Sequence, residues 1–255
     1  MKIFLILFLL FSSLFANEYK LRKYDNVKSF YQSISKDVVD LSIKYKIPPA
    51  VILAIAGLES GYGSGYVAQI TGNILSLGAG KSEKELPSLT LPYCQNDKRK
   101  VTLFDPKDQQ NCETLVWKKR PKSLKKDYRP KTIAGTHQDL AYFKKYPLKY
   151  KEAKLNNIKD FLTKWINKDH KYQPFKQSRL WLDQKIAKNG IECLFDINTN
   201  LGFLKQIGGK QNSFNYRKSW LIKVEYILKN TGLIKLCKDI YYKKSSFDIA
   251  WNNKI

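Results

Sequence analysis

The 255-residue sequence predicts an α+β protein that is mainly helical, with a small β-hairpin lobe and a helical insertion. Apolar residues recur at helical spacing along most of the chain. Residues 91–117 instead combine short β-prone pieces with turn residues. Apolar side chains make up 43% of the chain, enough for a hydrophobic core and too many for a disordered chain.

A proline break separates the first two predicted helices. Residues 26–46 carry apolar positions at helical spacing: Val27, Phe30, Tyr31, Ile34, Val38, Val39 and Leu41. Pro48 and Pro49 interrupt this pattern, and a proline can open the next helix because its missing N–H would have no partner there. Residues 50–58 are almost wholly apolar, which is typical of a buried helix. The glycines at 61, 63 and 65 end it.

The predicted hairpin follows a loop-like segment at residues 72–90. Its strands are expected at Lys100–Phe104 and Thr114–Trp117, with turn residues between them. Residues 118–131 are basic and interrupted by proline, so we expect a surface loop there.

Helical patterns dominate after residue 131. They predict helices at about 132–145, 155–167, 175–189, 199–207 and 214–229. Within the expected insertion at 150–200, the core candidates are Phe161, Leu162, Trp165, Leu180, Trp181 and Ile186. Trp117 and Trp220 are also expected in the core.

The N-terminus resembles a secretory signal peptide. Lys2 precedes an apolar run, Ile3–Phe11, which is short for a membrane span. Cleavage is expected after Ala16, and an uncleaved anchor is the alternative. We expect an exported protein of the periplasm, cell envelope or extracellular space, with no transmembrane segment after cleavage.

The charge is strongly positive. The chain has 46 Lys and Arg against 22 Asp and Glu, a formal net charge of +24 that falls by one when Lys2 is removed. Such a charge attracts polyanions in general. Few of these residues are arginines, the side chains that read bases in pairs of hydrogen bonds, so we expect no specific binding of nucleic acid.

Four cysteines follow the predicted signal peptide, and an even number in an exported chain favours disulfides. Of the three possible pairings, we expect the sequence neighbours, Cys94 with Cys112 and Cys193 with Cys237. The two histidines, His137 and His170, lie far apart in the sequence. We therefore expect neither a metal site nor a cofactor.

Glu59 is the leading catalytic candidate. It ends a very apolar helix, where burial and the negative end of the helix dipole both favour its protonated form. A protonated carboxyl can donate a proton to a leaving oxygen. The glycines that follow leave room for an extended substrate, and Tyr62 and Tyr66 offer flat faces for sugar rings. In the alternative interpretation, Glu59 has no catalytic role: it ends the helix and points to water, and the glycines cap the helix.

The residues around Glu59 also carry a family resemblance. The segment Ile52–Ser64 (ILAIAGLESGYGS) resembles the LAQAALESGWGxS signature of the bacterial glucosaminidase family, glycoside hydrolase family 73. This family includes flagellar, autolysin and Bax-like peptidoglycan hydrolases. The segment Gly72–Ala79 (GNILSLGA) is similar to its NNLFGIKA segment, and SFNY at 213–216 resembles its TDPNYA helix.

The resemblance implies a lysozyme-like fold and cleavage of the β-1,4 bond between GlcNAc and MurNAc in peptidoglycan. Glu59 would be the acid of this endo-β-N-acetylglucosaminidase. A second carboxylate would lie on the β lobe, where Glu113 fits best and Glu83, Glu85 and Asp105 are rivals. The implied division is a signal peptide (1–16), an extension (17–34), the main domain (35–240) and a tail (241–255).

The resemblance also suggests substrate-binding residues. Tyr62 lies in the motif itself. Asn73 either binds an acetamido group or holds its own loop through an Asx turn. The family tyrosine after the β lobe aligns near Thr136 and His137, so either His137 replaces it or Tyr142 is its counterpart.

Some alternatives remain open. The insertion at 150–200 either closes one end of a glycan groove or thickens the helical lobe. The protein is expected to be a monomer that binds peptidoglycan glycan strands. A lytic transglycosylase and a non-catalytic wall-binding module are the alternative functions.

Overall fold

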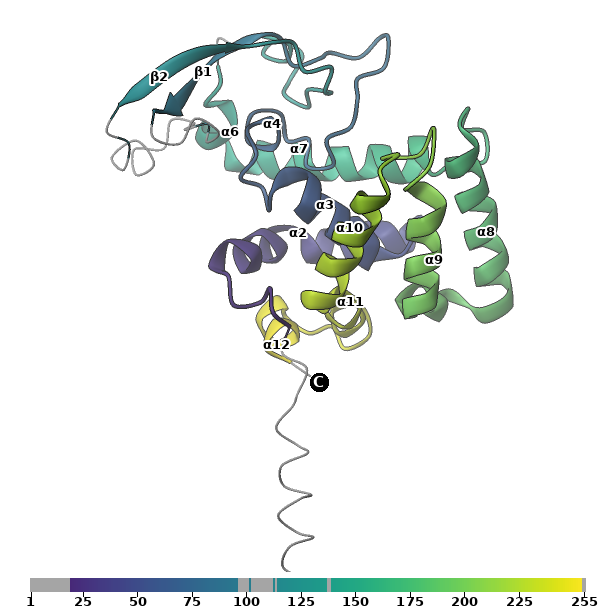
Figure 1. Ribbon diagram of the computed structural model, residues 1–255. Coiled ribbons are helices and arrows are strands. Elements are labelled where there is room, and N and C mark those ends of the chain that lie inside the picture. Colours follow the sequence, from purple (N-terminus) through teal and green to yellow (C-terminus); the bar gives the residue numbers. More distant parts are fainter. Residues whose placement is uncertain (1–18, 96–100, 102–111, 113, 137–138, 254–255) are drawn as a thin grey trace, which may run out of the picture. The chain divides into compact units, whose positions relative to one another are not determined.

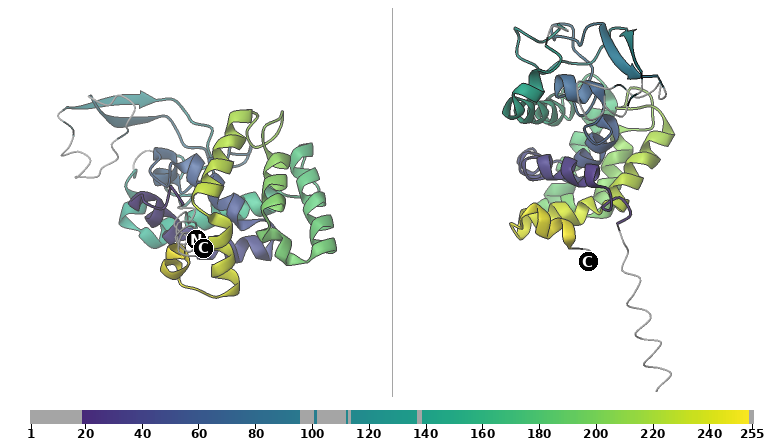
Figure 2. Two further views of the ribbon diagram at one scale, coloured as in Figure 1. Left: turned by 60° about the horizontal axis from the view of Figure 1, so that its bottom comes forward. Right: turned by 90° about the vertical axis from the view of Figure 1, so that its left-hand side faces the viewer.

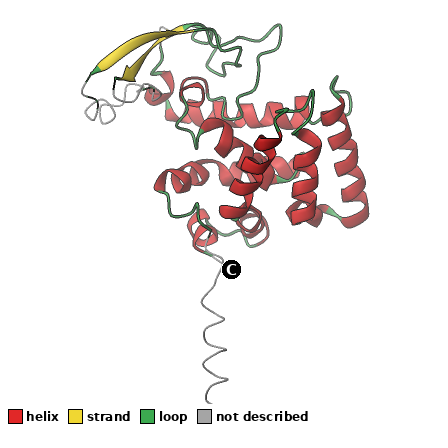
Figure 3. Ribbon diagram, in the orientation of Figure 1, coloured by secondary structure: helices red, strands yellow, loops and turns green. Residues whose placement is uncertain are grey.

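The computed structural model describes residues 19–95, 101, 112, 114–136 and 139–253 (Figure 1). The prediction of a mainly helical protein with a small antiparallel sheet is confirmed for these residues (Figure 3). None of the helices in this part of the chain combines the length and hydropathy needed to cross a membrane.

The chain forms two compact units. The terminal unit comprises residues 1–54 and 171–255, and the central unit comprises residues 55–170. The division falls within helix α3 (Pro49–Ser60). Residue 34, after which the sequence analysis places the start of the main domain, lies inside α2 (Asp25–Lys44). The expected tail at 241–255 contains a helix, α12 (Phe247–Asn252), with Trp251 buried, so it is part of the terminal unit.

The predicted first helix is confirmed as α2, whose apolar positions are buried in the terminal unit. This helix contacts α11 (Leu233–Tyr242) and α12. Neither α11 nor α12 was predicted from the sequence. They follow α10 (Lys218–Asn230), which matches the prediction at 214–229.

Arg22 ties the N-terminal segment to the C-terminal helices. Its guanidinium donates to the carbonyl oxygens of Trp251 and Thr231, the latter at 2.9 Å. The group lies over the rings of Tyr19 and Trp251, with its Cζ 4.4 and 4.9 Å from the ring centroids. Burial lowers the pKa of the Arg22 guanidinium to about 10, although Tyr19 and Asp239 act in the opposite direction.

Two helices of the terminal unit, α8 (Gln173–Asn189) and α9 (Ile197–Ile207), lie side by side (Figures 1 and 2). The 3₁₀ turn η2 (Ile191–Phe195) connects them. Gly202 lies on α9 where a Cβ would come within 2.8 Å of the ring of Trp181 on α8, so glycine permits this close packing. Asp196 caps α9 by accepting a hydrogen bond from the Thr199 N–H at 2.9 Å.

Helix α3 confirms the prediction of a buried helix. It begins at Pro49, and every residue from Ala50 to Gly57 is buried. The uniformly apolar sequence explains this burial, because no side of the helix carries a polar group that needs water. Leu58 and Glu59 are the first residues of α3 that are half-buried.

The sheet of the central unit is a two-stranded antiparallel hairpin, β1 (Leu89–Cys94) and β2 (Leu115–Arg120). The second predicted strand is confirmed, although it runs three residues beyond Trp117. The other strand of the sheet lies at 89–94, and the strand predicted at 100–104 falls outside the described residues except for Val101, which forms a β-bridge with Tyr93. Leu89, Leu91 and Tyr93 pack with Ile70 and Leu86 in a buried cluster. This cluster holds β1 against α4 (Tyr66–Thr71).

The helix predicted at 132–145 is wrong for most of its length. Of the described residues in this range, only those of α6 (Tyr142–Lys145) are helical, and Gly135 has φ +82°. The next helix, α7 (Pro147–Asp160), continues into the π-helical turn η1 (Phe161–Trp165). Together they correspond to the prediction at 155–167. Phe161 and Leu162 are buried as predicted, whereas Trp165, Leu180, Trp181 and Ile186 are half-buried.

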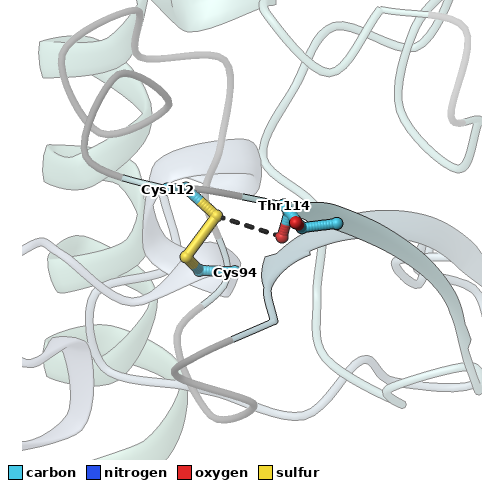
Figure 4. Close-up of a disulfide and its surroundings, with 3 residues drawn as sticks. All are labelled: Cys94, Cys112 and Thr114. Carbon is cyan, nitrogen blue, oxygen red and sulfur yellow. Dashed lines mark hydrogen bonds between the residues drawn. A yellow bond between two sulfur atoms is a disulfide. The ribbon is translucent and has the colours of Figure 1, made fainter.

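The disulfide predictions are half correct. Cys94 and Cys112 are bonded, with Cα atoms 5.4 Å apart (Figure 4). The Cys112 sulfur lies 3.3 Å from the Thr114 carbonyl oxygen, a close contact because a disulfide sulfur carries no hydrogen. The pairing of Cys193 with Cys237 is wrong, since both are free, buried thiols. Each packs as a small apolar side chain, and burial raises the pKa of both thiols.

Candidate active site

Glu59 lies one residue before the end of α3 and is half-buried. Its neighbour Ser60 is buried and makes two hydrogen bonds. The Ser60 hydroxyl donates to the Ala56 carbonyl oxygen at 2.6 Å and accepts from the Gly63 N–H at 2.8 Å. The serine therefore joins the last turn of the helix to the glycine loop, directly beside the candidate acid.

The loop after α3 is held in a left-handed conformation. Gly61, Tyr62 and Gly63 have φ of 55°, 55° and 80°. Positive φ is easy for glycine and unfavourable for tyrosine, so the two glycines flank a strained residue. At Gly65, a Cβ would lie only 3.0 Å from the Ser60 carbonyl oxygen, which accepts the Gly65 N–H at 2.8 Å. The glycines of the motif are thus required by the turn itself.

Lys125 provides a positive charge near Glu59. Its ammonium donates to the Ser76 carbonyl oxygen at 2.6 Å. Burial lowers the pKa of Lys125, and the attraction of the Glu59 carboxylate opposes this effect. A cation favours the ionised form of a neighbouring carboxylate. It therefore acts against the burial and helix-end effects from which we expected a protonated Glu59.

Asn73 holds the loop that follows α4. Its side-chain amide donates to the Leu77 carbonyl oxygen at 2.8 Å and to the Lys126 carbonyl oxygen at 3.0 Å. Its side-chain oxygen accepts from the Leu77 N–H and from the amide of Asn157, at 2.8 and 2.9 Å. Asn73 is only 1% exposed. Of the two interpretations from the sequence, these contacts support the loop-holding one.

Asn157 connects this loop to α7. Its side-chain oxygen accepts from the Leu75 N–H at 2.8 Å. Its amide also lies 3.2 Å from the Tyr128 hydroxyl, which donates to Asp160 at 2.9 Å. Asp160 in turn pairs with Lys126. Burial raises the pKa of Tyr128, and Asp160 adds to this effect although the bond from Asn157 opposes it. We refer to Asn73, Asn157, Tyr128, Asp160 and Lys126 as the loop network.

Sequence reasoning missed most of the loop network. One signal was available, because Asn157 lies four residues after Ala153 and four before Phe161, on a buried face of α7–η1. A polar residue on such a face needs a hydrogen-bonding partner. Lys125 and Lys126 could not have been found, since they belong to a run of similar basic residues.

A buried ion pair organises the segment that carries His137. Arg129 donates to Asp127 through Nε and NH2, the latter at 2.5 Å, and both side chains are fully buried. Arg129 also donates to the carbonyl oxygens of Thr136 and Asp139, at 2.8 and 3.2 Å. The chain is therefore fixed on both sides of His137, which itself lies outside the described residues.

The base of the hairpin lies against α4. The Arg120 guanidinium lies over the rings of Tyr66 and Tyr93, with its Cζ 5.6 and 5.2 Å from their centroids. Tyr66 begins α4, directly after the glycine loop. This stack joins the hairpin to the element that follows Glu59. The sequence predicts a flat ring at Tyr66 for a sugar, and it does not predict this stack with Arg120.

The remaining predicted residues have different positions. Tyr142 is 8% exposed and packs with Phe143 and Ala153, so its ring belongs mainly to a core cluster. Tyr62 is half-buried in the glycine loop. Glu113 and its rival Asp105 lie outside the described residues. The other two rivals pair with lysines, Glu83 with Lys126 and Lys164, and Glu85 with Lys122.

The terminal unit contains a hollow of about 760 Å³ that includes none of the predicted site residues. Its lining includes Tyr19, Phe195, Leu228, Lys238 and Tyr242. The described residues contain no group of three or more His, Cys, Asp or Glu side chains placed to hold a metal ion.

Comparison with known proteins gives no match. No protein-family model matches the sequence, and neither the curated proteins nor the solved structures include a significant match to the chain.

Proposed function

We propose that this protein is a peptidoglycan hydrolase, an endo-β-N-acetylglucosaminidase in which Glu59 is the general acid. The observation that carries the proposal is the position of Glu59. It is a half-buried carboxylate at the end of a buried helix, followed at once by a glycine turn with three left-handed residues. The sequence motif of the glucosaminidase family, ESGxG, coincides with this turn.

In the proposed reaction, Glu59 protonates the glycosidic oxygen as the bond to the GlcNAc ring breaks. Water then attacks the anomeric carbon and gives a proton to a base, which leaves a reducing GlcNAc end and a free hydroxyl on MurNAc. Glu113 is our candidate for the second carboxylate, and the acetamido group of the substrate is an alternative. A base that activates water would lie about 6.5–9.5 Å from the acid, whereas a nucleophile would lie about 5–5.5 Å away.

The loop network supports this proposal because it fixes the backbone around the acid. Asn73 and Asn157 hold residues 73–77 in place, and Lys125 is bonded to Ser76 in the same loop. Catalytic groups act efficiently when their surroundings are held in one geometry. We infer a lysozyme-like arrangement from the same features, a mainly helical protein with a small β lobe and an acid at a helix end.

We further propose that the protein is exported to the cell envelope. The basic and apolar N-terminal sequence supports a signal peptide, and the bond between Cys94 and Cys112 suits an oxidising compartment. The large positive charge favours attraction to an anionic envelope surface.

Product analysis tests the proposed reaction. Purified residues 17–255 are incubated with peptidoglycan beside the Glu59→Gln and Glu152→Gln variants, and soluble fragments are identified by mass spectrometry. Glu152 is an exposed carboxylate on α7 and serves as the matched control. We expect fragments with reducing GlcNAc ends from the wild type and the control, and none from Glu59→Gln.

Other products would overturn the proposal. Anhydro-MurNAc ends would identify a lytic transglycosylase, which needs only one catalytic carboxylate. Binding without release of fragments would identify a wall-binding module. Full activity of Glu59→Gln would exclude Glu59 as the acid.

A further inference from the structure

The outer face of the hairpin has an unexpected aromatic residue. Trp117 on β2 is 54% exposed, although the sequence predicted it in the core. The strand register explains the difference. Leu89, Leu91 and Tyr93 of β1 belong to the buried cluster. Successive residues of a strand point to opposite faces, so Pro92 lies on the other face, and Trp117 is its partner on β2. Trp117 therefore projects from the side opposite to the core.

Two polar side chains lie on one side of Trp117 on this face, and the buried Pro92 lies directly opposite. Lys119 lies two residues further along β2 and pairs with Thr90 of β1, and both are exposed. Residues two apart on a strand share a face and are separated by about 6.5–7 Å. The outer face thus presents an indole ring, a hydroxyl and an ammonium group next to one another.

The position of this face is fixed at both ends of the hairpin. Arg120 stacks between Tyr66 and Tyr93 at one end, and the Cys94–Cys112 disulfide lies at the other. Trp117 lies between these anchors. A ligand that meets this face does not need to order the hairpin first, which reduces the entropic cost of binding.

The chemistry of the face favours a sugar with an acidic substituent. An indole ring offers a large flat apolar surface on which the C–H face of a pyranose can stack. The Thr90 hydroxyl can bond to sugar hydroxyls, and Lys119 can pair with a carboxylate. A bilayer would instead require several apolar side chains at one depth.

We propose that the outer face of the hairpin, formed by Trp117, Lys119 and Thr90, binds peptidoglycan strands through one sugar ring and a carboxylate of its stem peptide. This inference rests on the proposed function for the identity of the polymer. It adds a binding surface on β1 and β2, whereas the proposed acid lies on α3. Substrates with intact stem peptides are bound more tightly than bare glycan.

Binding is tested in the Glu59→Gln background, so that the polymer is not degraded. The added substitutions are Trp117→Ala, Trp117→Phe and Lys119→Gln, with Tyr226→Ala as the control. Tyr226 on α10 is 51% exposed, nearly the same as Trp117. Dissociation constants are measured by sedimentation with insoluble peptidoglycan and with the same material after enzymatic removal of its stem peptides.

We expect Trp117→Ala to weaken binding to both materials about tenfold, corresponding to the loss of one stacked ring. Trp117→Phe should recover part of the loss. Lys119→Gln should weaken binding only to peptide-bearing material, and less so at high salt because ion pairs are screened. Tyr226→Ala should leave both constants within about twofold, since a lone exposed ring carries little binding energy outside an interface.

Equal binding by Trp117→Ala and the parent would overturn the inference, as would an equal loss for Tyr226→Ala. If Lys119→Gln weakened binding equally with and without the stem peptides, Lys119 would not recognise the stem peptide and that part of the inference would be wrong. Circular dichroism spectra and melting temperatures verify that each variant folds. Loss of binding in Trp117→Ala, together with an inactive wild type, would refute the hydrolase and support this surface.

Discussion

The side-chain amide of Asn157 donates to the side-chain oxygen of Asn73 across 2.9 Å, although 84 residues separate them in the chain. Asn157 also accepts from the Leu75 N–H. One residue of α7 therefore completes the hydrogen bonds of the loop that follows α4. The shape of this loop therefore depends on α7, most of which lies in the insertion expected at 150–200.

Asn157→Ala should destabilise the central unit by about 2–3 kcal/mol, because it leaves the buried Leu75 N–H without its acceptor. Urea unfolding measures the change. The exposed neighbour Asn156 supplies the control, since it takes no part in the loop network. Similar midpoints for the two variants would show that the network contributes nothing to stability.

Lys125→Met should move the alkaline limb of the pH profile of kcat/KM to higher pH. The Lys125 ammonium favours ionised Glu59, so its removal allows the acid to keep its proton at higher pH. Lys122→Met, a change at an exposed lysine paired with Glu85, is the control. The profile is measured for release of soluble fragments from peptidoglycan. A shift to lower pH would contradict the assigned roles of both residues.

Glu83 should make the free energy of unfolding depend on pH in the acidic range. Burial alone would raise the pKa of this carboxyl, but hydrogen bonds from the Gly80 N–H and the Lys126 ammonium outweigh burial and hold the pKa at about 2. A lowered pKa contributes stability above the usual value near 4.5, and this contribution disappears as the pH falls toward 2.

The Glu83→Gln variant should be less stable than the wild type at pH 6 by about 1 kcal/mol, a value reduced to allow for solvent screening. The difference should decrease between pH 4.5 and 2. Thermal unfolding at several pH values measures it, and Glu152→Gln is the control on an exposed helix face. A difference that is constant with pH would contradict the assignment.

The Cys94–Cys112 bond should be the one disulfide found among the four cysteines. Its sequence separation is 18 residues, for which the loss of chain entropy in the unfolded state is worth about 3 kcal/mol. Replacing both cysteines with serine should therefore lower the free energy of unfolding by about this amount. Peptide mapping without reduction identifies the pair.

Thiol labelling provides the complementary measurement. Cys193 and Cys237 should react with an alkylating reagent only after unfolding, because both thiols are buried. A disulfide-linked peptide containing Cys193 and Cys237 would contradict the structure and restore the pairing predicted from the sequence.

Secondary structure could be predicted best from the sequence where one local property dominates. Residues 49–60 form a helix because nearly all are apolar, and this holds in any surroundings that bury them. Strand β1 was not predicted. It contains Pro92, which has no N–H to donate to the ladder, and its register with β2 depends on pairing with residues 115–120, which a local pattern does not show.

The error at 132–145 has a different cause. Arg129 binds the carbonyl oxygens of Thr136 and Asp139, which removes them as helix acceptors. Such a bond depends on a side chain several residues away and has no periodic signal. For Glu59, the sequence indicated the helix end and the glycine turn, but the Lys125 charge follows only from the folded backbone.

The two segments of the terminal unit also have a consequence for the order of folding. Residues 55–170 form one continuous stretch, so the internal contacts of the central unit can form before residues 171–255 are in place. Helix α2 instead waits for α11 and α12, and Arg22 finds its carbonyl partners only when Trp251 has been synthesised. A chain that lacks α11 and α12 would therefore leave α2 without the helices that cover it.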